Sequence, residues 1–182
     1  VYPKTERGSI GIRVGVGGSP ESVMRAARLG IPLALAIIGG DPSRFAPFSK
    51  LYRMALAEQG KPELPVSIHS PGHIAETDEQ AIEEMWPCYL ESFGRIGRER
   101  GWGETSKDHF VSEVRYGSMY VGSPETVAAK ITHALTSVSA SRFDLKYANG
   151  TMPHSKLMNT IRLYAEEVAP RVRAAVEKES AA

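Results

Sequence analysis

The densest group of residues suited to chemistry lies near the amino-terminal end, where glycines and serines meet a predicted helix start. Gly17 and Gly18 follow an apolar segment, and Ser19 and Pro20 are types preferred at the N-cap and first position of a helix. Such a junction leaves backbone N–H groups unpaired beside the positive end of the helix dipole. Together with Ser22, these residues are predicted to bind a phosphate, although they also suit a tight turn with ordinary capping.

Three histidines are candidates for proton transfer. His69 and His73 follow an apolar segment, and a histidine titrates near neutral pH, but a hydrogen-bonded structural role is the commoner one. Their spacing resembles a helical metal pair, yet Pro71 and Gly72 lie between them and no third ligand is evident, so no metal site is predicted. His109 lies in a polar segment, where solvated charges are also the commoner interpretation.

A second copy of the first motif occurs later in the chain. Residues 122–127 read Gly-Ser-Pro-Glu-Thr-Val, against Gly-Ser-Pro-Glu-Ser-Val at residues 18–23. The second copy does not directly follow a predicted strand, so we interpret it as a helix start and not as a binding site. Asn149 and Gly150 suit a turn that could also line a site, and Cys88 is expected to pack as a small hydrophobe.

The composition excludes several classes of protein. Of the 182 residues, 42% are hydrophobic and 24% charged, as in globular proteins. Lys and Arg total 22 against 21 acidic residues and form no stripe, so nucleic acid is not expected as a partner. No apolar run reaches the length of a membrane span. A single cysteine excludes an internal disulfide and, with no visible signal peptide, favours a cytoplasmic location.

The elements that must position these residues alternate between strand and helix. Strands are predicted at residues 10–16, 33–38, 66–69 or 66–75, and 143–147, and helices at residues 20–29, 42–59, 77–100, 122–136 and 155–176. The run at 33–38 is typical of a strand buried on both faces, and Pro87 is expected to kink or end its helix. Residues 101–118 are predicted to form a long mobile loop, and residues 177–182 a disordered tail.

This alternation predicts a single α/β domain with a parallel sheet. A doubly wound sheet and a (β/α) barrel are the two competing architectures. A Rossmann dinucleotide site is disfavoured, because the third glycine of the fingerprint that begins at Gly15 would fall at Pro20.

Four segments resemble the luciferase-like flavin-dependent monooxygenases, a family that includes bacterial luciferase. They occur in the family's order, at residues 14–23, 29–38, 121–127 and 147–151 with the helix that follows. The resemblance implies a (β/α)8 TIM barrel, of which this chain would be only the second half, strands five to eight with their helices. The first and last strands would then be open edges. We therefore expect the chain to pair with the missing N-terminal half or with a second copy, as a homo-oligomer.

The resemblance also implies a cofactor site and a lid. The implied cofactor residues are Gly17 near the flavin, Gly18, Ser19 and Ser22 at its phosphate, and Ala36 and Ile37 beside its ring. Residues 101–118 would be the mobile lid over this site.

The resemblance implies an enzyme that uses reduced FMN and oxygen on a small organic substrate. A flavin reductase would supply the reduced FMN. The enzyme's catalytic acid or base is expected to come from the missing strands. Within this chain, the three histidines named above are the candidates. Three alternatives stay open: a non-catalytic flavin- or phosphate-binding half-barrel, a hydride-transfer enzyme that uses the deazaflavin coenzyme F420, and an unrelated phosphate-binding α/β enzyme.

Overall fold

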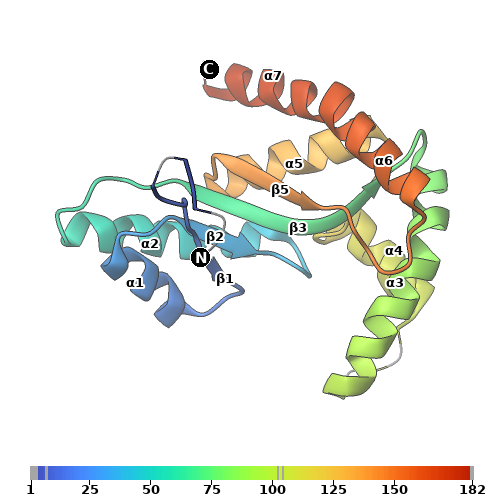
Figure 1. Cartoon of the computed structure of the whole chain (residues 1–182), viewed down its shortest axis with the longest axis horizontal. Coiled ribbons are helices and arrows are strands. Elements are labelled where there is room, and N and C mark those ends of the chain that lie inside the picture. Colours follow the sequence, from blue (N-terminus) through green and yellow to red (C-terminus); the bar gives the residue numbers. More distant parts are fainter. Residues whose placement is uncertain (1–3, 7, 102, 104, 181–182) are drawn as a thin grey trace.

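Strands and helices alternate along the described part of the chain, which comprises residues 4–6, 8–101, 103 and 105–180 of a computed structural model (Figure 1). In this part, five strands form one parallel sheet, and one or more helices follow each strand. The predicted α/β class with a parallel sheet is therefore confirmed.

The first strand–helix unit has the bounds that its capping residues dictate. β1 (Val14–Val16) leads into α1 (Pro20–Leu29), which begins after the N-cap Ser19 and ends at Gly30. Gly30 has φ 64°, a left-handed conformation that glycine adopts without a Cβ clash, and its N–H bonds carbonyls of the last turn. The helix predicted at residues 20–29 is confirmed.

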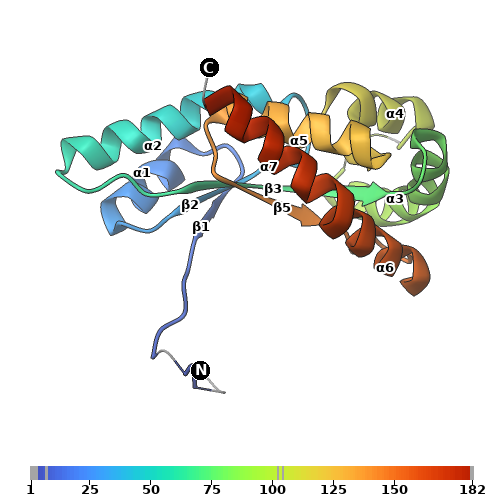
Figure 2. The same ribbon diagram turned by 90° about the horizontal axis from the view of Figure 1, so that it is seen from above.

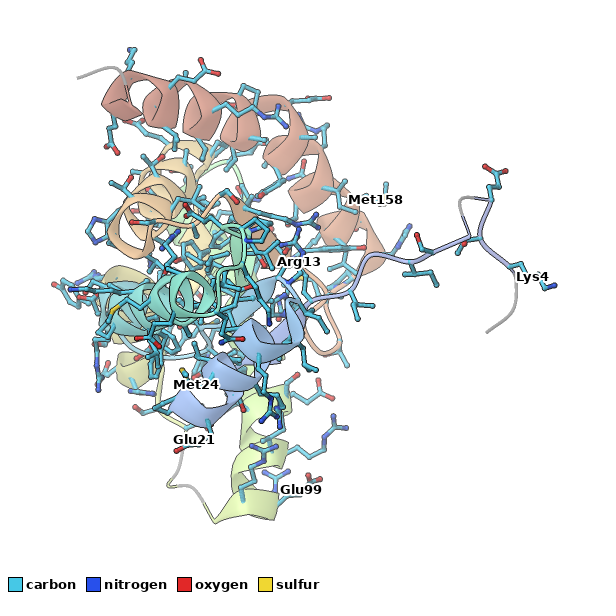
Figure 3. The ribbon with its side chains drawn as sticks, turned by 90° about the vertical axis from the view of Figure 1, so that its left-hand side faces the viewer. Lys4, Arg13, Glu21, Met24, Glu99 and Met158 are labelled. Atoms are coloured by element: carbon cyan, nitrogen blue, oxygen red, sulfur yellow. The ribbon has the colours of Figure 1, made fainter. Side chains whose placement is uncertain are left out.

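The strand predicted at residues 10–16 is shorter in the structure, because only β1 pairs with a neighbouring strand. The side chains of Ile10 and Ile12 are 60% and 62% exposed. They lie on a segment that runs away from the sheet and carries Lys4 near its far end (Figures 2 and 3). Alternating apolar residues therefore do not form a strand here without a pairing partner.

The middle of the sheet follows the predicted pattern. The next elements are β2 (Leu33–Ala36), the short 3₁₀ helix η1 (Pro42–Phe45), α2 (Ala46–Glu58) and β3 (Val66–Ile74). Asp41 caps η1 by accepting the Ser43 N–H at 2.8 Å. β3 takes the longer of its two predicted extents, because its carboxyl-terminal part gains a separate partner strand.

The segment after β3 differs most from the sequence-based expectations. It contains α3 (Asp78–Arg100), α4 (Lys107–Tyr116) and β4 (Tyr120–Gly122). Pro87 does not end α3. Most of the loop predicted at residues 101–118 is helix α4, which buries Phe110 and Val114 in a cluster with α3 residues. Residues 102 and 104 of that predicted loop lie outside the described residues.

The chain ends with a nearly continuous helix. The remaining elements are α5 (Pro124–Val138), β5 (Arg142–Lys146), α6 (His154–Leu163), the π-helical turn η2 (Tyr164–Val168) and α7 (Ala169–Ser180). The π turn lies just before Pro170, whose ring and missing N–H disfavour a regular α-helical turn. α7 continues through residues 177–180, where a disordered tail was predicted. Residues 181–182 of that tail lie outside the described residues.

β3 is the central strand of the sheet. β2 pairs along its first part, β5 pairs opposite residues 67–71, and β4 pairs opposite residues 72–74. β1 pairs only with β2, and β5 only with β3, among the described residues. Both strands therefore have an open edge, as expected of part of a barrel.

Helices α2, α5 and α7 lie along one face of the sheet (Figure 2). Leu33 and Leu35 of β2 are buried in the main core, whereas the alternate residues Ala34 and Ala36 are half-exposed on the other face. The expectation that this strand is buried on both faces is therefore wrong within the described chain. We call the uncovered side the open face.

Two buried clusters hold the helices in place. The larger cluster joins the sheet to α1, α2, α5 and the carboxyl-terminal helices. The smaller one joins α3 and α4 to the carboxyl ends of β3 and β4, and contains the buried Cys88. In it, the Tyr89 ring centroid lies 4.3 Å from that of Phe93 and 4.7 Å from that of Phe110. This aromatic cluster fixes α4 at the carboxyl edge of the sheet.

Candidate functional site

The turn between β1 and α1 is open above its backbone. Gly18 has φ 118°, a conformation that residues with a Cβ rarely adopt, so the turn depends on this glycine. Apart from the adjacent residues, no atom of the described chain lies within 4 Å of the place that a Cβ would take at Gly17 or Gly18. A group of the size of a phosphate can therefore approach the start of α1 closely.

Glu21 shows that the start of α1 attracts an anion. The Ser19 hydroxyl donates to Oε2 of Glu21 at 2.8 Å, and Oγ of Ser19 accepts the Ser22 N–H at 3.2 Å. A hydrogen bond from the backbone N–H of Glu21 to its own carboxylate lowers the pKa of this side chain. The carboxylate is exposed and points outward (Figure 3), so it can give way to a ligand anion.

Arg25 adds a cation that the sequence interpretation missed. Its guanidinium donates to Oγ of Ser22 at 3.2 Å, one turn into α1. The signal that could have found it is its spacing, since residues three apart lie on the same helix face. A guanidinium beside the serines can pair with phosphate oxygens.

The second Gly-Ser-Pro-Glu junction, between β4 and α5, is filled by the protein's own carboxylate. Asp78 accepts the Ser123 N–H at 2.6 Å and the Thr126 hydroxyl at 2.8 Å. A Cβ at Gly122 would lie only 2.7 Å from Oδ1 of Asp78. The second copy is a helix start, as predicted, but β4 directly precedes it, contrary to expectation. Of the two copies, only the first has room for a ligand.

The end of β2 lies beside this open turn, because Val16 of β1 pairs with Leu35. Ala36 is half-exposed on the open face, where a bound ring could reach it. Ile37 is fully buried in the main core, so the prediction that its side chain lines a ring pocket is wrong. The reason is the two-residue alternation of a strand. Ile38, which the sequence interpretation missed, is 58% exposed.

His73 has a structural role and cannot reach a substrate. Its ring is fully buried, with Nε2 2.8 Å from Oε2 of Glu84 and Nδ1 2.9 Å from Oγ1 of Thr160. Burial lowers the pKa of His73, against the opposing effect of Glu84. These bonds tie β3 to α3 and α6. As a candidate for proton transfer, His73 is therefore ruled out by its surroundings.

The other two histidines lie on different elements. His69 is half-exposed on the open face of β3, with Ala36 and Asp144 as its neighbours in register. His109 is exposed on α4. Among the described residues, no hydrogen bond joins the two histidines. Asn149 is buried and structural, since its amide donates to the Gly72 carbonyl at 3.0 Å.

A cavity of about 490 Å³ lies between the carboxyl end of β2 and helices α3 and α4. Its lining includes Ile38, Gly39, Tyr89, Phe93, His109, Glu113 and Met119. Both carboxylate oxygens of Glu113 accept the Gly40 N–H, at 3.0 and 3.3 Å, so α4 is tied to the loop after β2. The segment predicted to be a lid thus covers a cavity as a helix, and its movement stays a prediction.

Two further features are absent from the described part of the chain. No group of three or more His, Cys, Asp or Glu side chains there comes together in a way that could hold a metal ion. None of the helices described combines the length and the apolar character needed to cross a membrane.

Fold and site together define a class of protein. A parallel sheet with helices on one face, an open second face and unpaired edges is the arrangement of part of a (β/α)8 barrel. The open turn and the cavity lie at the carboxyl ends of the strands, where barrel enzymes have their active sites. The sequence model of the luciferase-like monooxygenase family matches residues 1–142, and the chain belongs to this family.

Solved structures share this fold over about half of their length. Monooxygenase RslO1 from Streptomyces bottropensis is 25% identical with TM-score 0.70, over 93% of this chain and 50% of that one. The oxygenating constituent of 3,6-diketocamphane monooxygenase from Pseudomonas putida, in complex with FMN, is 17% identical with TM-score 0.66. The match covers 88% of this chain and 48% of that one. The F420-dependent tetrahydromethanopterin reductase from Methanopyrus kandleri is 16% identical with TM-score 0.56. The match covers 90% of this chain and 51% of that one. A comparison with curated protein sequences gives no match.

Proposed function

We propose that this chain is the phosphate-binding part of a flavin-dependent monooxygenase that uses reduced FMN and oxygen on a small organic substrate. The observation that carries the proposal is the open turn at Gly17 and Gly18, in a chain of the luciferase-like monooxygenase family. The matching junction at Gly122 supports this choice, because a carboxylate already fills it. On this proposal β1, β2, β3 and β5 are the fifth to eighth strands of the barrel, and the three-residue β4 is additional to them.

The residues present suit an FMN phosphate. Backbone N–H groups at the start of α1, with the hydroxyls of Ser19 and Ser22, would bind its oxygens, and Arg25 would supply positive charge. Ala36 would lie beside the ring, since β1 and β2 are neighbours. When bound, the reduced flavin supplies the electrons for oxygen activation. The part of α4 that lines the cavity would exclude water from the reaction.

The proton chemistry is proposed to come mainly from residues that complete the barrel. Within this chain, His69 on the open face and His109 at the cavity are the two candidates that the structure leaves accessible. Imidazole is the side chain that enzymes use most often as a general acid or base, so either residue suits proton transfer to a reacting oxygen.

Coenzyme F420 is the second candidate cofactor. Two of the solved structures with this fold are F420-dependent enzymes, the tetrahydromethanopterin reductase and a secondary alcohol dehydrogenase. A turn built largely from backbone N–H groups does not distinguish one phosphate ester from another. A hydride-transfer reaction would then replace oxygen chemistry.

The partners follow from the same proposal. The open edges of β1 and β5 would pair with the residues that complete the barrel, or with a second copy of the chain. A flavin reductase would supply the reduced cofactor, and a cytoplasmic location remains our expectation from the single cysteine.

A fluorescence titration of FMN with riboflavin as control tests the proposal. We expect FMN, and not riboflavin, to bind, because only FMN carries the phosphate. Ser19→Asp should weaken FMN binding by about tenfold or more, since it places a second negative charge against the phosphate. Ser106→Asp is the matched control, because Ser106 caps α4 in the same way at an exposed position. Glu21→Gln should tighten binding a few-fold, since it removes the competing carboxylate.

The outcomes separate the alternatives. Equal affinity for FMN and riboflavin would show that the phosphate is not held. FMN binding that Ser19→Asp leaves unchanged would place the phosphate elsewhere and overturn the assignment. FMN binding without NAD(P)H- or oxygen-dependent turnover would favour a non-catalytic flavin-binding half-barrel, and preference for F420 would favour hydride transfer.

A further inference from the structure

The cavity at the carboxyl end of β2 differs from the phosphate-binding turn in the chemistry of its walls. Its volume of about 490 Å³ lies within the usual range for small-molecule sites. Tyr89 and Phe93 of α3 line it, with ring centroids 4.3 Å apart and ring planes inclined by 22°. Ile38 and Met119 also line it, so most of its surface is apolar or aromatic.

Ile38 adds exposed apolar surface to the cavity. Its side chain is 58% exposed, although it lines the cavity. Leaving aliphatic surface in water costs about 25 cal/mol for each Å² that a ligand would bury. A flat apolar ligand would remove this cost.

The two ionisable side chains that line the cavity, His109 and Glu113, come from α4, and Thr105 just before this helix adds a hydroxyl. His109 and Glu113 are one helical turn apart, and both line the cavity. The Gly40 N–H holds the Glu113 carboxylate in place at 3.0 and 3.3 Å, and each oxygen keeps a lone pair for a second donor. The His109 imidazole has no hydrogen-bond partner among the described residues, where only its backbone N–H is bonded.

We propose that this cavity binds an aromatic substrate that carries a hydroxyl group. The ring would pack against Tyr89 and Phe93, and the hydroxyl would donate to the Glu113 carboxylate. That this ligand is the substrate rests on the proposed function, whereas its binding does not. The negative charge of Glu113 disfavours an anionic ligand, so the cavity and the phosphate-binding turn take different chemical groups.

Three probes of similar size test each part of this assignment by calorimetric titration. They are 2-naphthol, naphthalene without the hydroxyl, and 2-decalol without the aromatic ring. 2-Naphthol has both features, so it gains a hydrogen bond to a charged acceptor and packing between aromatic rings. We expect 2-naphthol to bind about tenfold more tightly than either of the other two.

Variants assign the two preferences to separate residues. Glu113→Gln should remove most of the preference for the hydroxyl, because it removes the charge of the acceptor. Phe93→Leu should reduce the preference for the aromatic ring. Because it does not change the contact between Glu113 and Gly40, it still tests the cavity if Glu113→Gln loosens α4. Glu99→Gln, at the exposed end of α3 (Figure 3), is the matched control and should change neither preference.

Competition with flavins separates this inference from the proposed function. Displacement of 2-naphthol by FMN or riboflavin would show that the cavity holds the flavin ring, and would overturn the inference. Equal binding of 2-naphthol and 2-decalol, or selectivity that neither variant changes, would also overturn it. Should FMN fail to bind while 2-naphthol selectivity depends on Glu113, the proposed function fails and the cavity assignment stands.

Discussion

Two buried tyrosines predict opposite effects of the same substitution. Tyr52 and Tyr120 are both fully buried. The Tyr52 hydroxyl donates to the Ile31 carbonyl at 2.8 Å, whereas the Tyr120 hydroxyl has no hydrogen-bond partner among the described residues. Burial raises the pKa of Tyr120, and the nearby Ser70 hydroxyl opposes this effect. The Ser70 hydroxyl, however, donates its proton to the Ile37 carbonyl at 2.7 Å.

The expected magnitudes follow from these environments. An unsatisfied buried hydroxyl costs about 1–3 kcal/mol, so Tyr120→Phe should raise the free energy of unfolding by about 1–2 kcal/mol. The ring contacts survive the change, because Phe keeps the 4.5 Å edge contact with Phe143 and the position under the Lys130 amine. Tyr52→Phe should lower the free energy of unfolding by about 1 kcal/mol, since a satisfied hydrogen bond is lost.

Urea denaturation followed by circular dichroism measures both changes. A difference of about 1 kcal/mol corresponds to roughly 2–4 °C in the thermal midpoint of a domain of this size. The reasoning fails if Tyr120→Phe destabilises the chain as much as Tyr52→Phe does. That result would mean that the Tyr120 hydroxyl is satisfied in solution, by water or by a bound ligand.

Two further perturbations test the packing and the buried histidine. Gly72→Ala should destabilise the fold by about 3 kcal/mol in urea unfolding, because its Cβ would lie 2.3 Å from the Tyr120 carbonyl oxygen. Gly15→Ala is the control and should be nearly neutral, because a Cβ there would have no described atom within 4 Å beyond the adjacent residues. Stability should also fall as the pH drops below 6.5, because burial lowers the pKa of His73 and the unfolded chain therefore takes up the proton first. Urea midpoints between about pH 5 and 8 should show a shallower slope for His73→Gln, and an unchanged slope would exclude His73 as its cause.

Helix starts and ends were the features most accessible from the sequence. Ser19 and Gly30 bound α1, and Ser123 caps α5, as their residue types indicate. A cap depends on groups within one helical turn, so neighbouring residues suffice to specify it. The same locality made the open turn at Gly17 and Gly18 visible as a candidate site.

Short strands and the helix over the cavity were not predictable in this way. β4 has three residues and pairs with β3 only because Gly72 lets the Tyr120 backbone approach. α4 buries mainly Phe110 and Val114, too few residues to produce a clear helical period. Both elements depend on partners more than ten residues away in the chain.

The sequence by itself determined the α/β class, the caps, the family resemblance and the existence of two Gly-Ser-Pro-Glu junctions, because these depend on local chemistry and order along the chain. Only the tertiary structure decided which junction is open, since the carboxylate that fills the second one comes from Asp78, 45 residues before Ser123. It also decided that Ala36 and not Ile37 faces the open side, and that Glu113 meets Gly40 beside a cavity. The physical reason is that burial and charge pairing arise between segments brought together by folding.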